Sequence, residues 1–175
     1  MRVVAGKARG HKLIAPAGIT TRPTGDRMKE DLFNILSSRL AGARFLDLYC
    51  GSGAMGIEAL SRRAASATFV DQSKAAISAT TANLQKTGLI EDAEILYMSA
   101  EKALHKLDIF DIIFIDPPYD GDYNILLLLP PILADDGIVV VECPIEIECN
   151  ATGLRLYRQK IYGKMQFMFF QKDFF

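Results

Sequence analysis

The segment 45–60 constrains the fold of this chain more than any other, because it reads as a strand, a glycine-rich turn and a helix in immediate succession. Its apolar start predicts a buried strand, and its apolar end predicts a helix. Between them, Gly51, Gly53 and Gly56 match the Gly-x-Gly-x-x-Gly pattern of dinucleotide-binding folds. A strand that leads through such a turn into a helix is typical of a parallel sheet covered by helices.

The same alternation continues along the chain. Strands are expected at 44–49, 67–70, 94–98, 110–115 and 138–142, and helices at 28–36, 54–62, 73–86, 101–106 and 123–133. Thr24 or Asp26 is expected to cap the first helix. A terminal hairpin is expected from 154–161 and 164–170, and a small N-terminal hairpin from 3–5 and 12–15. The pattern predicts a Rossmann-like α/β fold, with a mostly parallel seven-stranded sheet and helices on both faces.

Three carboxylates fall at the predicted ends of strands. Asp47 lies four residues before Gly51, Asp71 follows Gly51 by twenty residues, and Asp116 follows a third strand. Ligands of open α/β sheets bind beyond the carboxyl ends of the strands, so one crevice can hold all three acids. The alternatives are structural: Asp47 could bond loop amides, and Asp71 could begin a helix.

Two cofactor classes compete for this turn. An acid at Asp71 can bind ribose hydroxyls in either class. A nicotinamide cofactor would place a pyrophosphate at the helix N-terminus, whereas S-adenosylmethionine carries an ammonium group and a sulfonium. Asp47 would repel the pyrophosphate and attract the ammonium, with a Coulomb energy of about 4 kcal/mol at 4 Å and an effective dielectric constant near 20 as an upper guide.

The run Asp116-Pro117-Pro118-Tyr119 directly follows the apolar segment 110–115. Proline fixes φ at about −65° and donates no hydrogen bond, so the carbonyls here are rigid acceptors. Asp116 and the Pro117 carbonyl can accept both hydrogens of an exocyclic amine, while the Tyr119 ring stacks on the heterocycle that bears it. A rigid strand-exit turn is the alternative, because Asp and Pro favour turns.

Taken in order, these motifs resemble those of S-adenosylmethionine-dependent amino-methyltransferases. The opening blocks 2–10 (Arg-Val-Val-Ala-Gly-Lys-Ala-Arg-Gly) and 21–36 (Thr-Arg-Pro-Thr-Gly-Asp-Arg-Met-Lys-Glu-Asp-Leu-Phe-Asn-Ile-Leu) narrow the resemblance. They are similar to the bacterial 16S ribosomal RNA guanine-N2 methyltransferase family, and the similarity covers nearly the whole chain. The Asp-Pro-Pro-Tyr motif alone also occurs in DNA adenine-N6 enzymes.

The resemblance implies a set of site residues. The catalytic residues would be Asp116, Pro117, Pro118 and Tyr119, and the cofactor would contact Asp47, Tyr49, Gly51, Gly53, Asp71, Gln72, Ser99, Ala100 and Asp116. The family often has an Asp near the end of the third strand, touching the adenine amine. Here that region is 97–101, and Ser99 or a backbone carbonyl is expected to serve instead.

The charge of the chain is unevenly spread. The net charge is −1, but residues 1–30 hold seven basic and two acidic groups. A basic arm on an acidic body indicates where an anionic polymer docks. The expected RNA-binding residues are Arg2, Lys7, Arg9, Lys12, Arg22 and Arg27. A solvated hairpin is the alternative, and Arg22 and Arg27 could instead contact the cofactor carboxylate.

Other features limit the classes of protein. Half of the 175 residues are apolar, which suits one domain, with 1–24 as a basic extension and 25–175 as a catalytic core. Three cysteines without metal spacing and two isolated histidines predict no metal site. With no secretory signal, the cytoplasm is the expected compartment. The longest apolar stretch, 125–134, contains two prolines and is too short to cross a bilayer. A monomer is expected.

The sequence therefore predicts methylation of the exocyclic N2 amine of a guanine in 16S ribosomal RNA, with naked RNA or the small ribosomal subunit as the partner. Three rival classes remain. A DNA adenine-N6 methyltransferase shares the chemistry, but it normally needs a further target-recognition segment. A nicotinamide oxidoreductase shares the glycine turn, and a non-catalytic RNA-binding module shares the basic arm.

Overall fold

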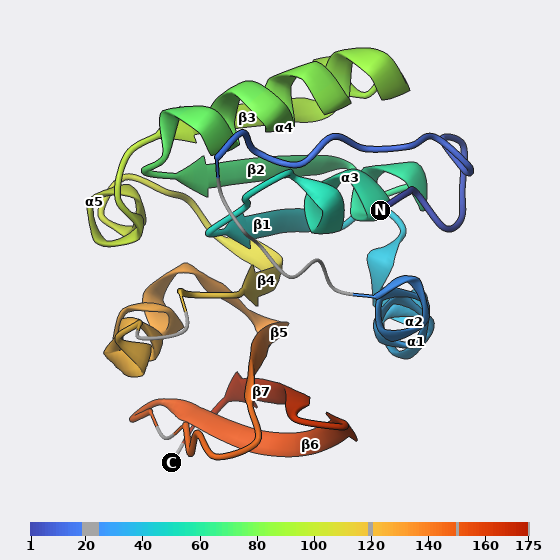
Figure 1. Cartoon of the computed structure of the whole chain (residues 1–175). Coiled ribbons are helices and arrows are strands. Elements are labelled where there is room, and N and C mark those ends of the chain that lie inside the picture. The colour runs from blue at the N-terminus through green and yellow to red at the C-terminus, as the bar shows by residue number, and fades with distance from the viewer. Residues whose placement is uncertain (19–24, 119–120, 150, 175) are drawn as a thin grey trace.

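A seven-stranded sheet forms the centre of the computed structural model, which describes residues 1–18, 25–118, 121–149 and 151–174. The strands are β1 (Arg44–Leu48), β2 (Ser66–Asp71), β3 (Ala93–Tyr97), β4 (Phe110–Ile115), β5 (Leu133–Pro144), β6 (Leu154–Tyr162) and β7 (Met165–Lys172). Their order is β3-β2-β1-β4-β5-β7-β6 (Figure 1). The first five strands are parallel, and β7 is antiparallel to both of its neighbours. The predicted Rossmann-like α/β sheet is confirmed.

The helices differ from the prediction mainly in the segment before β5. They are α1 (Asp26–Ile35), α2 (Ser37–Leu40), α3 (Ala54–Ser61), α4 (Lys74–Thr87) and α5 (Ala100–Leu104), with 3₁₀ helices η1 (Ile90–Asp92), η2 (Tyr123–Leu128) and η3 (Pro130–Ile132). The helix expected at 123–133 is wrong, because Pro130 and Pro131 lack the amide donors that an α-helix needs. β5 accordingly starts at Leu133 rather than at Ile138.

The first helix is also capped differently from the prediction. Gly25 is the N-cap of α1, and no side chain caps it. Asp26 is instead the first helical residue, and its carboxylate pairs with Arg2 Nε at 2.8 Å. The expectation that Asp26 is the cap is therefore wrong, whereas Thr24 lies outside the described residues.

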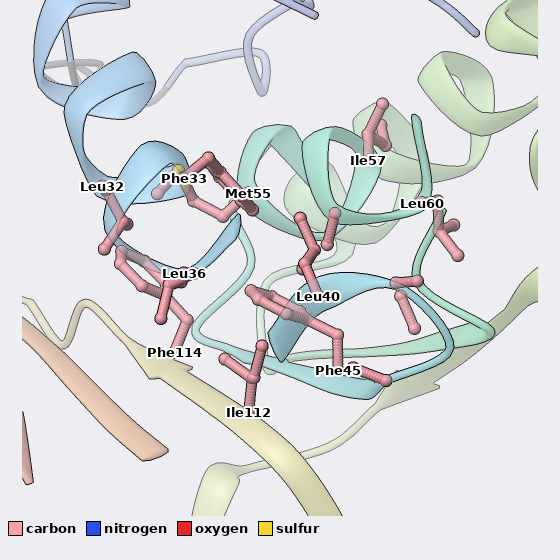
Figure 2. Close-up of a cluster of buried hydrophobic side chains, with 14 of the residues drawn as sticks. Leu32, Phe33, Leu36, Leu40, Phe45, Met55, Ile57, Leu60, Ile112 and Phe114 are labelled. Atoms are coloured by element: carbon pink, nitrogen blue, oxygen red, sulfur yellow. The ribbon is translucent and has the colours of Figure 1, made fainter. Parts of the chain in front are cut away.

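Two apolar clusters cover the two faces of the sheet. The first joins the strands to α1, α2 and α3 through residues such as Phe33, Phe45 and Ile57 (Figure 2). The second joins the opposite face to α5, η2 and η3 through residues such as Leu104 and Leu126. Among the described residues, no helix is long and apolar enough to span a membrane.

The N-terminal arm (residues 1–18) does not form the predicted hairpin strands. A single bridge between Arg2 and Lys12 replaces them. The reason lies in where the backbone groups find partners. The amides of Val4 and Ala5 donate to the Glu58 carboxylate at 2.8 and 2.9 Å, so they are not available to a second strand.

Glu58 in α3 is the buried centre of this region. Its side chain is fully buried, and its carboxylate lies 2.8 Å from Arg62 Nε and 3.3 Å from Lys29 Nζ of α1. Lys29 also donates to the backbone oxygen of Arg2. Burial lowers the pKa of Lys29, and the attraction of Glu58 opposes that effect. One carboxylate therefore holds the arm, α1 and α3 together.

We predict that Glu58→Gln lowers the free energy of unfolding by about 3–5 kcal/mol, because it leaves the buried Lys29 without its counter-charge. Urea unfolding measures the loss. Glu91→Gln, at an exposed position, is the matched control and should change stability by no more than about 0.5 kcal/mol. Equal stability of the two variants would contradict the prediction.

Candidate active site

The three glycines of the turn after β1 serve three different purposes. Gly51 has φ +55°, and a Cβ there would meet nothing within 4 Å, so the backbone is open to a ligand. Gly53 has φ +75° and packs on Thr80, whose Cγ2 would lie 2.9 Å from an added Cβ. At Gly56 a Cβ would come within 2.3 Å of the Phe69 ring, so this glycine permits the close packing of α3 on β2.

Tyr49 begins this turn in a left-handed conformation, with φ +67°. Such a backbone is strained by about 1–2 kcal/mol for a residue with a side chain, and strain of this kind gathers at functional sites. Burial raises the pKa of Tyr49 to about 12, and the nearby Glu101 and Asp122 act in the same direction. The half-buried phenol is therefore neutral at physiological pH.

Asp71 ties the glycine turn to the end of β2. Its two carboxylate oxygens accept from the amides of Gly51 at 3.0 Å and of Ser73 at 2.8 Å. Thr80 Oγ1 donates to the Gly51 oxygen at 3.0 Å from the other side. A carboxylate has about four acceptor sites, so Asp71 can still accept from the hydroxyls of a ligand. The alternative that Asp71 begins a helix is wrong, because Asp71 ends β2 and Ser73 caps α4, and the ligand role of Asp71 stays a prediction.

Asp47 is buried next to this turn, with 1% of its surface exposed. Its Oδ2 accepts from the Gly56 amide at 2.9 Å, so the carboxylate does have a structural contact, although with the first turn of α3 and not with a loop as the structural alternative anticipated. Burial raises the pKa of Asp47 to about 8 despite this bond, and the negative charge of Asp71 contributes. A cation beside Asp47 would relieve that cost, whereas a pyrophosphate would increase it. The residues present therefore fit an ammonium-bearing cofactor.

Strand register brings Asp116 to the same edge of the sheet. Ile115 pairs with Leu48 of β1 and with Val141 of β5, so Asp116 follows at a position between Tyr49 and Glu142. The Asp116 residue is exposed at the edge, yet its carboxyl is crowded by the surrounding strand ends. Burial, followed by the charges of Glu142 and Asp47, raises the pKa of Asp116 well above its ordinary value.

The rest of the Asp-Pro-Pro-Tyr motif is described only in part. Pro117 is buried and Pro118 is exposed, and the Pro118 oxygen accepts from the Gly121 amide at 2.6 Å. A Cβ at Gly121 would lie 2.7 Å from that oxygen, so Gly121 and Pro118 approach each other closely. Tyr119 lies outside the described residues, and its stacking role stays a prediction.

Glu142 is a site residue that the sequence reasoning missed. It is 5% exposed and stands at the end of β5 beside Asp116. The signal was present, because an acid that follows the apolar run 138–141 occupies a strand end like the other three carboxylates. Four acids thus meet at one edge of the sheet.

The remaining predicted cofactor residues lie at the ends of β2 and β3, on the same edge. Gln72 is exposed directly after Asp71, and Ala100 is buried in the first turn of α5. Ser99 caps α5 and accepts from the Lys102 amide at 3.4 Å, so its side chain already has a structural task. Their contacts with a cofactor stay predictions.

The predicted RNA-binding residues are dispersed. Arg2 pairs with Asp26, and Lys7 pairs at 3.4 Å with Asp92, which precedes β3 at the opposite, amino edge of the sheet. Figure 1 shows the dark-blue turn of the arm beyond the C-terminal end of α3. Arg9, Lys12 and Arg27 are exposed, and Arg22 lies outside the described residues. The structure thus separates Lys7 from the carboxylate edge.

Other surfaces offer less chemistry. Two shallow hollows lie at the amino edge, one beside α2 and Asp136 and one beside Arg44 and Glu94, and none of the four clustered carboxylates lines them. Within the described ranges, no group of His, Cys, Asp and Glu could hold a metal ion.

Comparison with known proteins agrees with this site. The sequence model of the family described as "Conserved hypothetical protein 95" matches residues 1–171. The Bacillus subtilis protein YlbH, named as a candidate rRNA methyltransferase, is 40% identical over 93% of this chain and 94% of its own length. Ribosomal RNA small subunit methyltransferase D of Escherichia coli K12 is 34% identical over 99% of this chain and 90% of its own.

A solved structure agrees at the level of the whole fold. Escherichia coli yhhF, described as a candidate methyltransferase, superposes with a TM-score of 0.86 at 34% identity, covering 99% of this chain and 98% of that one. Because the family match spans nearly all of the sequence, the chain belongs to the family of S-adenosylmethionine-dependent methyltransferases that includes ribosomal RNA small subunit methyltransferase D.

Proposed function

We propose that this protein is a cytoplasmic, monomeric enzyme that methylates the exocyclic N2 amine of a guanine in 16S ribosomal RNA of the small ribosomal subunit. The observation that carries the proposal is the position of Asp116. It stands beside two prolines at the edge of the sheet where Asp47 and the glycine turn also lie. The relatives named for ribosomal RNA support the choice of substrate.

β1, β2 and the glycine turn would form the cofactor side of the candidate site. Asp47 would pair with the ammonium group, the open backbone at Gly51 would admit the methionine portion, and Asp71 would accept from ribose hydroxyls. S-adenosylmethionine supplies a methyl group on a cationic sulfur. Four acids at one edge of the sheet favour that cation over a nicotinamide cofactor, whose pyrophosphate they would repel.

Asp116 and the Pro117 carbonyl act on the guanine amine. The lone pair of that nitrogen is delocalised into the ring, so it is a poor nucleophile. Acceptance of both N–H hydrogens by Asp116 and Pro117 favours a tetrahedral nitrogen whose lone pair points toward the methyl carbon. A new N–C bond forms as the C–S bond breaks, and the amine loses one proton. Asp116 accepts that proton or passes it to water, as its raised pKa allows.

Methyl transfer from tritiated S-adenosylmethionine tests the proposal. The substrates are undermethylated 16S RNA, small ribosomal subunits and adenine-rich DNA, followed by nucleoside analysis. We expect label in N2-methylguanosine, strongest on one ribosomal substrate. Label in N6-methyladenine would identify a DNA adenine enzyme instead, and binding of RNA without any methyl transfer would favour a non-catalytic module.

We predict that Asp116→Asn slows single-turnover methyl transfer by about 10²–10³, by analogy with the loss of one preorganised electrostatic contact. The wild-type rate should rise with pH as Asp116 ionises, because the carboxylate is a stronger acceptor for an amine hydrogen than the protonated acid and can take up the released proton. Asp116→Asn should lose that rise. Asp108→Asn, at an exposed position before β4, is the matched control. A methyl-transfer rate of Asp116→Asn close to that of the wild type would contradict the catalytic role of Asp116.

Cofactor binding should release protons near pH 7. The pKa of Asp47 is about 8 without a cation, so the carboxyl is mostly protonated there, and an ammonium beside it lowers that pKa. Calorimetry in buffers of different ionisation enthalpy measures the release. The difference between wild type and Asp47→Asn isolates this carboxyl, and equal proton release in both would refute the prediction.

The raised pKa of the Asp47 carboxyl also makes the stability of the cofactor-free protein depend on pH. Its pKa in the folded state lies above the ordinary value of 3.8, so the folded state binds more protons than the unfolded state between about pH 4 and pH 8. The contribution of Asp47 to stability therefore falls as pH rises through that window. A pH series of unfolding curves for wild type and Asp47→Asn would reveal this difference.

A further inference from the structure

The β6–β7 hairpin is a second basic segment of the chain, besides the N-terminal one. Residues 154–172 contain five basic residues and no acidic residue, whereas residues 31–153 contain eight basic and eighteen acidic residues. The basic residues of the hairpin are Arg155, Arg158, Lys160, Lys164 and Lys172. β6 is also the edge strand of the sheet, so one of its sides has no neighbouring strand.

A β-bulge changes the register in the middle of β6. Leu156 pairs with Phe170 of β7, and Arg158 pairs with the next residue, Phe169, so Tyr157 is an extra residue without a direct partner. A bulge of this kind re-aims the side chains that follow it, because strand residues otherwise alternate between the two faces.

The bulge places three basic residues on one face. Arg155, Arg158 and Lys160 are paired with alternate residues of the β7 segment 167–171, and alternate residues of a strand share a face. In a regular strand, Arg155 and Arg158 would point to opposite faces. The shared face is the one that β7 packs toward α1, since Lys160 lies 3.5 Å from Asp31 of that helix.

The aromatic Tyr157 lies among these charges. It is 41% exposed, and its ring packs edge-on against Phe169 at a centroid distance of 6.2 Å. The Arg158 guanidinium lies over the same Phe169 ring at 6.0 Å. Basic groups beside an exposed aromatic ring suit a nucleic-acid strand, because phosphates bind the former and bases stack on the latter.

The hairpin also leads back to the catalytic edge. The Ile145 amide donates to the Lys164 oxygen at 3.1 Å, and Met165 pairs with Pro144, two residues after Glu142. From Lys160 to Arg155 the strand covers about 17 Å at about 3.3 Å per residue, which accommodates several nucleotides.

We infer that this face of β6, defined by Arg155, Tyr157, Arg158 and Lys160, binds backbone phosphates of the RNA whose guanine enters the site. The inference rests on the function proposed above. A second copy of the chain fits this edge poorly, because the bulge and the arginines oppose strand pairing and like charges repel. The N-terminal arm is a weaker candidate because of its position: Lys7 lies beside Asp92 at the amino edge of the sheet, whereas the hairpin turn lies beside Pro144 at the end of β5.

Binding of a 16S RNA transcript across a series of salt concentrations tests the inference. The double variant Arg155→Gln/Arg158→Gln should bind about tenfold more weakly at low salt, and the slope of log affinity against log salt should fall by about 2. The control Lys102→Gln/Lys106→Gln removes the same charge from exposed positions on and after α5. It should keep the wild-type slope.

Cofactor protection against thermal unfolding, equal in all three proteins, shows that the fold and the cofactor site are intact. An unchanged slope in the double variant, or an equal loss in the control, would overturn the inference. If the wild-type protein transfers no methyl group to RNA, that result contradicts the proposed function but not the proposed RNA-binding surface. A flattened slope in the double variant would still support the RNA surface in that case.

Discussion

The fold around the site depends on one buried carboxylate. Glu58 accepts from two amides of the N-terminal arm and forms ion pairs with Lys29 of α1 and with Arg62, the C-cap residue of α3. Removing a charge from water is costly, and the cost is offset only when every partner is in place. The arm, α1 and α3 therefore adopt their arrangement together or not at all. Because α3 begins at the glycine turn, this arrangement also fixes the turn that faces the cofactor.

Near the N-terminal end of α3, by contrast, charges of the same sign lie close together. Asp47 and Asp116 meet Asp71 and Glu142 at one edge, and burial and mutual repulsion raise the pKa of the first two. The protein keeps acids there that would be more stable apart. A cationic cofactor would relieve this repulsion, and an amine that donates hydrogen bonds would suit the same acids. The crowding of acids at this edge lowers the stability of the folded protein and favours the binding of a cation, a combination that is common at functional sites.

Much of this arrangement was predictable from the sequence, because apolar runs mark buried strands and the acids follow those runs directly. The glycine turn was predictable for the same reason, although the contacts of Gly53 and Gly56 with Thr80 and Phe69 join segments that are distant in sequence. The arm was predictable only in part, because some of its amides bond within the arm, as Val3 does to His11, whereas those of Val4 and Ala5 bond to the distant Glu58. A local sequence pattern indicates the periodicity of the apolar residues, but it does not indicate which distant residues form hydrogen bonds with each other. Glu142 was not predicted as a site residue, although it follows an apolar run as the other three acids do. A single acid after such a run belongs to no known motif.

The bulge at Tyr157 has a consequence for how such proteins diverge. A single-residue change in the length of β6 outside the bulge, such as deletion of Gln159, would place Arg158 and Lys160 on opposite faces of the sheet, while the hydrogen-bonded frame of β7 and β5 could stay in place. A change of one residue in β6 can therefore alter how the substrate docks. β6 lies far from β1 and β2, which would carry the cofactor side of the site. The outermost strand is a site where relatives could acquire new targets while inheriting the same methyl-transfer machinery.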